Sequence, residues 1–252
     1  LSIITAAVKI LKEEGYALYY FIINPKSRSD LGAKIWSQVE QELQKRRVVY
    51  QAFLTKYRGH AKKLARMLSD TLTQEDILAA IGGDGTLNEI VSGLTHPEQI
   101  TLGYIPTGSG NDFARGVGLA KDVPTALQAI LKPQVIRKID IGVCHASGRE
   151  RRFVISSGIG FDAGICHEAL ASPIKDFLNR FGLGKLTYAS IALRHLLFFK
   201  RFDLRLSMDG GRSASFCNVW FAAAMNLKYE GGGFKFCPSA NSADGFLDLM
   251  VV

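Results

Sequence analysis

The sequence has no apolar run that approaches the roughly 18 residues of a membrane-spanning helix. Its apolar N-terminal stretch, residues 1–11, is interrupted at Lys9. The four cysteines form no CxxC pair, so neither a zinc site nor a redox dithiol is indicated. We expect buried reduced thiols, which are compatible with a reducing cytoplasm, although four cysteines alone do not exclude bridging.

The common signatures of phosphoryl transfer are also missing. There is no GxxxxGK[ST] phosphate-binding loop and no protein-kinase set of catalytic-loop and DFG motifs. Internal repeats, low-complexity segments and a recognisable RNA- or DNA-binding module are missing as well. A chain of this kind that handles nucleotides therefore needs a different architecture, and nucleic acid ranks last among its partners.

The composition is that of an ordinary globular protein with a basic balance. The 252 residues are 47% hydrophobic, and 31 Lys and Arg against 23 Asp and Glu give a formal net charge of +8. The length suffices for one large domain or two ordinary ones. The positive charge favours an anionic partner, such as nucleotide phosphate, nucleic acid or an acidic lipid surface, without choosing among them.

Short apolar runs alternate with helical patterns in the first half of the chain. The run at 18–23 is typical of a strand buried on both faces, and the runs at 48–54, 77–81 and 102–105 are further strand candidates. Between them, apolar residues recur at helical spacing, as at Trp36, Val39 and Leu43. Strands that alternate with helices predict an α/β domain with a mostly parallel sheet. A last helix begins at Asp122 and ends at Pro133, where we place the domain boundary.

After residue 133 the pattern changes to short alternating runs. They predict antiparallel strands at 136–143, 152–156, 203–208, 213–225 and 246–252. Asp209-Gly210 between two of these runs indicates a type I′ hairpin turn, whose two central positions need positive φ. One basic helix is expected around residues 186–199. Residues 134–252 are thus predicted to form a second, β-rich domain.

The most informative segment comes where the third predicted strand ends, and it reads Gly82-Gly83-Asp84-Gly85-Thr86-Leu87-Asn88-Glu89. Three glycines let the backbone approach phosphate oxygens, and the amides at the start of the following helix point toward the same anion. An aspartate is out of place in a purely anion-binding turn unless a cation accompanies the phosphates. We therefore expect Asp84 to serve Mg²⁺, directly or through water. The alternative is a solvated acid that caps the helix.

A second glycine-rich loop, Pro106 to Arg115, follows the next predicted strand. Two such loops at one edge of a parallel sheet are expected to converge on one ligand. Taken alone, Asp112 could equally be a helix cap and Arg115 a surface cation. The segment Gly158 to Gly164 is superficially similar to a dinucleotide fingerprint, but it lacks a βαβ context, and we interpret its glycines as packing residues.

Together, the two glycine-rich loops resemble the paired signature of the diacylglycerol kinase catalytic family, which includes bacterial lipid kinases and sphingosine kinases. The resemblance covers nearly the whole chain after about residue 18, through Asn24-Pro25, Thr55 with Gly59 to Ala61, Ile139 to Gly142, Gly158 to Gly164 and Pro238 to Leu249. It implies a three-layer α/β ATP-binding domain at 1–133, then a mostly antiparallel β-sandwich at 134–252, with ATP in the cleft between them.

The resemblance also implies which residues form the sites. ATP would be surrounded by Asn24, Thr55, Gly82, Gly83, Asp84, Gly85, Thr86, Leu87, Asn88, Glu89 and Ser109. Asp84, Asp112 and Asp140 would organise Mg²⁺ through water. A further structural Mg²⁺ would bind the Asp244 side chain and the backbone carbonyls of Asn241 and Phe246, although an Asp-Gly sequence before a strand is also an ordinary turn.

Three departures from the family pattern stand out. Arg28 replaces a glycine of the usual NPxSG loop, where it would either contact phosphate or weaken the loop, and Ser109 stands where threonine is common. The acidic catalytic base is expected a few dozen residues beyond the Asp244 turn, hence beyond Val252, so we assign no catalytic residue. The chain is accordingly expected to be a fragment or an inactive homologue, and its start at Leu1 also indicates a missing beginning.

The implied reaction is the ATP- and Mg²⁺-dependent transfer of the γ-phosphate to the hydroxyl of diacylglycerol or a similar lipid. The alternatives are a catalytically silent lipid or nucleotide sensor and an NAD kinase-like enzyme; Asn111 to Ala114 and the Asp244 turn favour the lipid kinase. We expect a cytoplasmic protein that docks peripherally on the anionic inner membrane face, and a homodimer is a possible assembly. Residues 191–201 are the candidate docking helix, unless their apolar face packs on the sandwich.

Overall fold

The computed structural model describes residues 18–160 and 200–252. Contacts between residues divide the chain into two compact units, one formed by Leu1–Ile155 with Asn226–Phe246 and the other by Ser156–Met225 with Leu247–Val252. The predicted domain boundary after residue 133 stays a prediction. The two units are defined by contacts, which do not establish where one independently folding domain ends. No helix within the two described ranges is long and apolar enough to cross a membrane.

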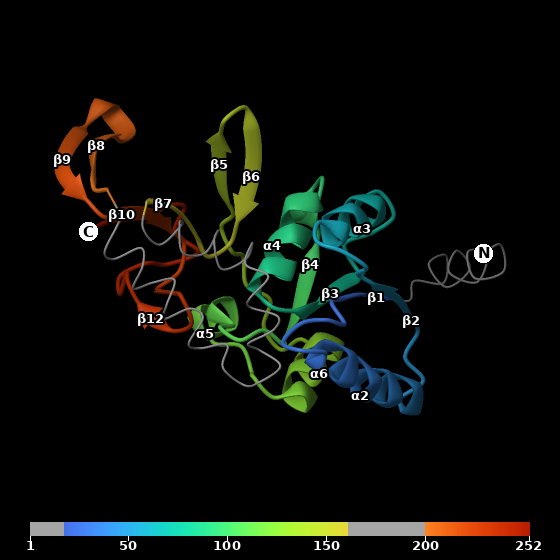
Figure 1. Ribbon diagram of the computed structural model, residues 1–252. Helices are drawn as coiled ribbons and strands as arrows, with labels where there is room; N and C mark the ends of the chain where they lie inside the picture. The colour runs from blue at the N-terminus through green and yellow to red at the C-terminus, as the bar shows by residue number, and fades with distance from the viewer. Residues whose placement is uncertain (1–17, 161–199) are drawn as a thin grey trace. The chain divides into compact units, whose positions relative to one another are not determined.

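A four-stranded parallel sheet forms the centre of the first unit (Figure 1). Its order is β2-β1-β3-β4, with β1 at Tyr19–Ile23, β2 at Tyr50–Leu54, β3 at Ile77–Gly82 and β4 at Thr101–Pro106. Every residue of β3 is buried, and so are four of the five residues of β1. Burial on both faces explains why these strands are continuous apolar runs, and the predicted parallel sheet is confirmed.

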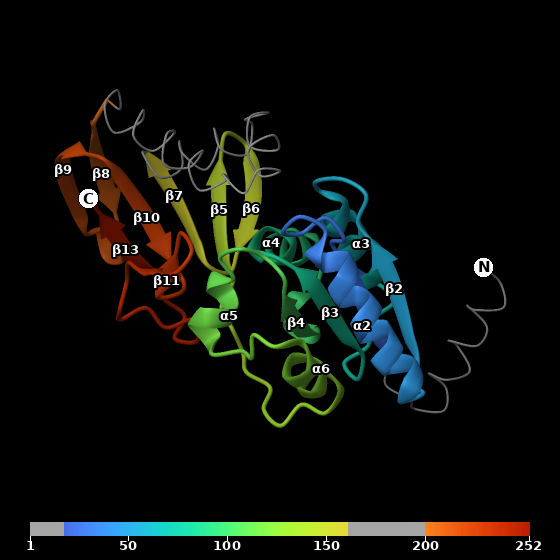
Figure 2. The same ribbon diagram turned by 60° about the horizontal axis from the view of Figure 1, so that its bottom comes forward.

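Helices cover both faces of this sheet, so the unit has three layers (Figures 1 and 2). Helix α2, Leu31–Lys45, and helix α6, Val123–Leu131, pack on one face, where Trp36 and Leu43 are buried. Helix α3, His60–Ser69, and helix α4, Asp84–Gly93, contribute to the apolar core on the other face. The three-layer α/β fold expected from the resemblance is therefore observed.

The order of the strands creates a switch point between β1 and β3. The chain leaves β1 through α2 on one face of the sheet and leaves β3 through α4 on the other face. The loops that follow these two neighbouring strands therefore diverge at the carboxyl edge of the sheet. In open α/β sheets the crevice at such a point is where ligands bind.

The rest of the first unit consists of short elements. Helix α5 spans Asp112–Val117, the hairpin pairs β5 at Gly142–Ala146 with β6 at Arg149–Phe153, and a small ribbon pairs β11 at Tyr229–Glu230 with β12 at Phe234–Lys235. A 3-10 turn, Pro97–Gln99, precedes β4. The strand expected at 136–143 is wrong over most of its length, because residues 136–141 are irregular and Ile136 is exposed.

The second unit is antiparallel. Strand β10, Phe221–Met225, lies between β7, Ser156–Gly160, and β13, Asp248–Val251, while β8, Phe202–Ser207, pairs with β9, Ser213–Val219. The β8–β9 hairpin is confirmed, but its turn is a 3-10 turn at Asp209–Gly211, with positive φ at Gly210 and Gly211. The expected type I′ turn is wrong, because it required positive φ at Asp209 and Gly210. The positive φ values lie one residue later, on two glycines, which adopt them readily.

Some expectations lie outside the described residues, namely the basic helix around 186–199 and most of the segment Gly158 to Gly164. Among the described cysteines, Cys144, Cys217 and Cys237 are free thiols. Cys237 is buried as expected. Cys217 is exposed, because it lies in β9, which pairs only with β8 among the described strands.

Candidate active site

The two glycine-rich loops lie against each other at the carboxyl edge of the sheet. The first passes from β3 into α4, and the second passes from β4 into α5. A methyl group added to Gly108 would lie 2.7 Å from the Cα of Gly83, and one added to Gly82 would lie 2.6 Å from the Cβ of Thr86. No side chain fits at either glycine: the close approach of the two loops explains Gly108, and the packing of Thr86 within the first loop explains Gly82. The predicted convergence of the two loops is observed.

Asp84 joins the two loops through its carboxylate. Its Oδ2 accepts a hydrogen bond of 3.0 Å from the backbone N–H of Asp112, and its Oδ1 accepts one of 3.2 Å from that of Phe113. Burial raises the pKa of Asp84, which the two N–H donors oppose, and the negative charge of Asp112 raises it further. Asp84 is thus a partly buried acid that caps α5 from a neighbouring loop.

Asp112 is more deeply buried and is held by two partners. Its Oδ1 forms an ion pair with Nη1 of Arg115, and its Oδ2 accepts a hydrogen bond of 2.7 Å from the backbone N–H of Gly232. The guanidinium of Arg115 also lies 5.9 Å from the ring centroid of Tyr229. Asp112 and Arg115 are therefore neither a plain cap nor a solvated cation, because they anchor the segment that contains β11.

A buried hydroxyl lies near both carboxylates. Tyr104 is 4% exposed, and its ring packs edge-on against Phe113 at 5.8 Å. Its hydroxyl has no hydrogen-bond partner within the described residues. Burial raises the pKa of Tyr104, and the negative charges of Asp84 and Asp112 raise it further. The phenol therefore stays protonated and keeps a donor available beside the two acids.

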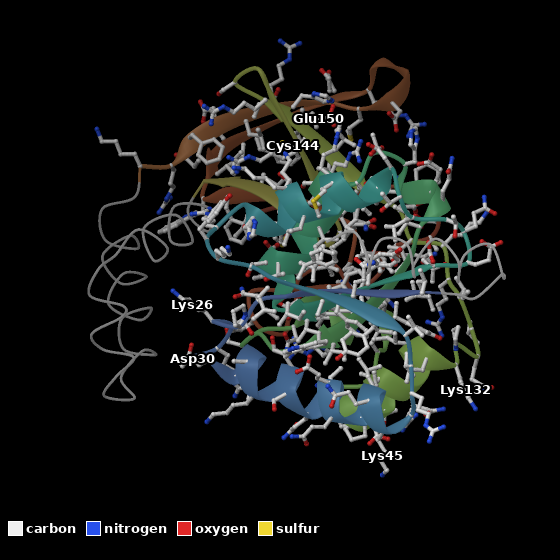
Figure 3. All side chains as sticks on the ribbon, turned by 90° about the vertical axis from the view of Figure 1, so that its right-hand side faces the viewer. Lys26, Asp30, Lys45, Lys132, Cys144 and Glu150 are labelled. Atoms are coloured by element: carbon white, nitrogen blue, oxygen red, sulfur yellow. The ribbon has the colours of Figure 1, made fainter. Side chains whose placement is uncertain are left out.

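The loop after β1 meets the same edge. Asn24 donates from Nδ2 to Oγ1 of Thr86 at 3.1 Å, and its Oδ1 accepts from the backbone N–H of Lys26. Ser27 and Thr107 share a buried hydrogen bond of 2.5 Å between their hydroxyl groups. Figure 3 shows Lys26 and Asp30 at the N-terminal end of α2, opposite Lys45. Three loops, after β1, β3 and β4, are thus connected by polar side chains.

Arg28 adopts a conformation that favours glycine. Its φ is 44°, and Ser29 and Asp30 follow with φ of 54° and 66°. The left-handed region is unfavourable for a residue with a Cβ atom. The resemblance implies glycine at this position, so Arg28 places a side chain on a backbone conformation that it strains.

Several expected ATP contacts form hydrogen bonds within the fold. Glu89 accepts from the backbone N–H of Gly59 at 2.8 Å, at the start of α3, and Asn88 accepts from that of Val154 at 3.2 Å. Thr55 donates its backbone N–H to Ile23 and so extends the pairing of β1 and β2. Leu87 is fully buried in the core, and Ser109 lies in the second loop.

The expected metal ligands fall into two groups. Asp84 and Asp112 belong to the converging loops, whereas Oδ2 of Asp140 accepts from the backbone N–H of Gly245 at 2.7 Å. The side chains of Asn241 and Asp244 accept from Ala243 and Phe246 within their own turn. Across the described part of the chain, no group of three or more His, Cys, Asp or Glu side chains is placed to hold a metal ion.

Sequence reasoning missed the glycine run at 231–233. Gly232 binds Asp112, and a methyl group on Gly233 would lie 3.0 Å from the guanidinium of Arg115, at a φ of 113° that only glycine adopts readily. Three consecutive glycines are a strong sign of a special backbone conformation, and that signal was available in the sequence. It did not indicate which part of the chain the run would contact.

Comparison with known proteins places this geometry in a family. A sequence profile described as the diacylglycerol kinase catalytic domain matches residues 19–144, and one described as the YegS C-terminal NAD kinase beta sandwich-like domain matches residues 160–252. The putative lipid kinase YtlR of Bacillus subtilis is 33% identical over 240 residues, which cover 93% of this chain and 77% of that protein. The diacylglycerol kinase of the same organism is 30% identical, covering 92% and 72%.

Solved structures agree with this assignment. A crystal structure of a diacylglycerol kinase from Bacillus anthracis str. Sterne superposes with a TM-score of 0.65 at 25% identity, over 94% of this chain and 73% of that one. A second, described as a putative diacylglycerol kinase from the same strain, gives a TM-score of 0.67 at 25% identity, over 94% and 75%. The chain therefore belongs to the diacylglycerol kinase catalytic-domain family.

Proposed function

We propose that the protein is a lipid kinase that transfers the γ-phosphate of ATP to the hydroxyl of diacylglycerol or a similar lipid, with Mg²⁺ as cofactor. The observation that carries the proposal is the position of Asp84, an acid held where two glycine-rich loops meet at the carboxyl edge of a parallel sheet, beside its switch point. Glycine-rich loops together with an acid are expected of a site that binds phosphates and a cation.

Gly85 supports phosphate binding at this edge. It lies in the first turn of α4, it is exposed, and a methyl group there would meet no atom within 4 Å. Neither packing nor a positive φ requires a glycine at this position, although glycine weakens a helix relative to alanine. A ligand that approaches the backbone closely is a physical reason for its presence.

The acids fit a Mg²⁺ ion that arrives with the nucleotide. Mg²⁺ is commonly held by one or two carboxylates together with substrate phosphates and water, and the paired loops supply Asp84 and Asp112. Each carboxylate oxygen of Asp84 accepts a single backbone N–H and keeps a lone pair for a metal or its water. When bound, the ion would neutralise charge on the transferred phosphoryl group. We keep as proposed Mg²⁺ ligands, on the ground of the resemblance alone, Asp140, Asn241, Asp244 and Phe246.

The reaction itself needs positioning more than covalent chemistry. The lipid hydroxyl oxygen forms a bond to the γ-phosphorus, the bond from that phosphorus to the bridging oxygen breaks, and ADP leaves with the electron pair. The hydroxyl proton passes to a base, and we assign none among the described residues. The loops would bind and orient the phosphates, and Asp84 and Asp112 would hold the cation.

The test is a phosphotransfer assay of the full-length protein with labelled ATP. Diacylglycerol, phosphatidylglycerol, sphingosine and NAD⁺ serve as acceptors, and Asp84→Asn is compared with the wild type. We expect a labelled lipid, and a loss of at least about a hundredfold in turnover for Asp84→Asn, since the residue acts on developing charge. Asp122→Asn is the matched control, because Asp122 also accepts a hydrogen bond from a helix N-terminus, at Thr125, but lies outside the loops.

Each result has a defined meaning. If NAD⁺ is the one acceptor that becomes labelled, the protein is an NAD kinase and the proposed lipid kinase activity is wrong. Binding of ATP without transfer to any acceptor would favour a sensor. Wild-type turnover in Asp84→Asn would refute the role of the site.

A further inference from the structure

A polar pocket lies in the first unit, at the end of α4 remote from Asp84. Its volume is about 430 Å³, and it is bounded by α3, by the C-terminal end of α4 and by β6. Figure 3 labels Glu150 on the β5–β6 hairpin, which contributes one wall. The lining residues are Lys62, Arg66, Ser92, Leu94, Thr95, Glu150 and Arg152. We call it the Arg152 pocket.

Arg152 is fixed within this pocket. Its Nη1 donates a hydrogen bond of 2.7 Å to the backbone carbonyl of Leu94, and its Nε lies 3.7 Å from Oε1 of Glu150. Ser92 donates from its hydroxyl to the backbone carbonyl of Arg152 at 3.1 Å, which joins β6 to α4. The Arg152 side chain is only 26% exposed, so its guanidinium is held in place before any ligand arrives.

The pocket carries an excess of positive charge. Lys62 and Arg66 are one helical turn apart on α3, so their side chains lie on the same face. Neither forms an ion pair with another described residue, and Glu150 is the single acid in the lining. Three cations against one acid repel one another, and a bound anion would remove that repulsion.

The Arg152 pocket is separate from the candidate active site. Asp84 is the first residue of α4, whereas Ser92, Leu94 and Thr95 lie at or just beyond its end. Ten residues at a rise of 1.5 Å span roughly 15 Å. An anion in this pocket would therefore contact the far end of the helix that carries Asp84, and ATP bound at the glycine-rich loops does not account for the positive charge.

We propose that the Arg152 pocket binds a phosphate-bearing anion as a second ligand site. A guanidinium held on two sides presents its remaining N–H groups to phosphate oxygens, and the two cations of α3 complete the charge. The volume exceeds the size of a free phosphate ion and admits a phosphate ester such as a glycerophosphate group. That group occurs both in soluble metabolites and in the headgroups of anionic phospholipids. The inference does not depend on the proposed kinase activity.

The test measures binding of both sources to the full-length protein. Lys62→Gln combined with Arg66→Gln removes two exposed charges that have no described ion-pair partner. Lys34→Gln combined with Lys45→Gln removes two exposed charges from α2, which covers the opposite face of the sheet, and is the matched control. Calorimetry with glycerol 3-phosphate and cosedimentation with phosphatidylglycerol vesicles are run at low salt.

We expect the α3 double variant to lower the affinity for one of the two ligands at least tenfold more than the α2 control does. The control corrects for general electrostatics, in which each lost cation near a membrane weakens binding about fivefold. A selective loss with glycerol 3-phosphate identifies a soluble ester, and a selective loss with vesicles identifies a lipid headgroup. Equal behaviour of the two double variants with both ligands overturns the proposal, and unchanged melting temperatures exclude unfolding as the cause of a loss.

Discussion

The Asp84 carboxylate accepts a hydrogen bond of 3.0 Å from the backbone N–H of Asp112, which ties the loop after β3 to the beginning of α5. The two acids are therefore close enough for the charge of Asp112, together with burial, to raise the pKa of Asp84. This arrangement holds a carboxylate where it is costly to ionise.

The raised pKa predicts how stability changes with pH. An acid whose pKa is higher in the folded than in the unfolded state binds more protons when folded, so stability falls as pH rises above the ordinary aspartate value of about 4. Asp84→Asn removes this dependence. We expect the unfolding free energy of the wild type minus that of Asp84→Asn to decrease between about pH 4 and about pH 7. Urea unfolding without ATP and Mg²⁺ measures it, and a constant or rising difference would contradict the raised pKa.

The sequence predicted the parallel sheet well, because the central strands β1 and β3 are buried on both faces and leave continuous apolar runs, which end at Asn24-Pro25 and at Gly82. It failed at residues 136–141, where the apolar residues have no partner strand. That segment is held by single bonds, such as the one from the backbone N–H of Asp140 to the carbonyl of Ser242. Local pattern carries no information about such long-range anchors.

In the candidate site, too, the sequence predicted the local arrangement but not the long-range contacts. The convergence of the two loops was predicted because both follow strands of one parallel sheet, yet the partner of Asp112, Gly232, lies 120 residues away in the sequence. Asn88 and Glu89 belong to the loop motif, but their side chains accept backbone hydrogen bonds from Val154 and Gly59. Motif spacing predicts which residues are near a site, and only the packed structure separates those that hold the loops from those left free for a ligand.

The loop after β1 should be strained by Arg28. A left-handed conformation costs a residue with a Cβ atom roughly 1–2 kcal/mol, and glycine avoids this cost. Glycine in turn lowers the stability by about 0.5–1 kcal/mol, because it loses more conformational entropy when the chain folds. We expect Arg28→Gly to stabilise the protein by up to about 1 kcal/mol in urea unfolding. Arg28→Ala is the control, because it removes the side chain but keeps the strain. Equal stability of the two variants would show that the guanidinium, and not the backbone, sets the free energy of this loop.

Membrane docking through the end of the proposed basic helix makes a separate prediction. The expected docking helix covers residues 191–201, of which 191–199 lie outside the described residues, while Lys200 and Arg201 are exposed and irregular, directly before β8. Arg201 stacks over the ring of Trp220 at 5.1 Å, so its replacement also costs a cation–π contact of about 0.5–1 kcal/mol. We expect Lys200→Glu, alone and with Arg201→Glu, to weaken binding to anionic vesicles stepwise while ATP affinity stays constant. Unaltered vesicle affinity at low salt would place the docking surface elsewhere.

The proposed approach of phosphate to Gly85 separates stability from function at a single residue. Because a methyl group there meets no atom within 4 Å and the residue is helical, Gly85→Ala should stabilise the protein by about 0.5–1 kcal/mol in urea unfolding. The same methyl group would occupy space that we assign to phosphate oxygens, so the affinity for ATP with Mg²⁺ should fall about tenfold, a loss of about 1.4 kcal/mol of binding free energy.

Ser37→Ala is the matched control for this variant. Ser37 is an exposed residue within α2 and belongs to none of the three loops, and its replacement also raises helix propensity. We expect the control to gain stability and to bind ATP as the wild type does, when both are measured by calorimetry. A Gly85→Ala protein that is stabilised and binds ATP normally would mean that the phosphates do not approach this turn. A destabilised one would mean that the backbone itself requires glycine, and either result would remove the support that Gly85 gives to a nucleotide at the start of α4.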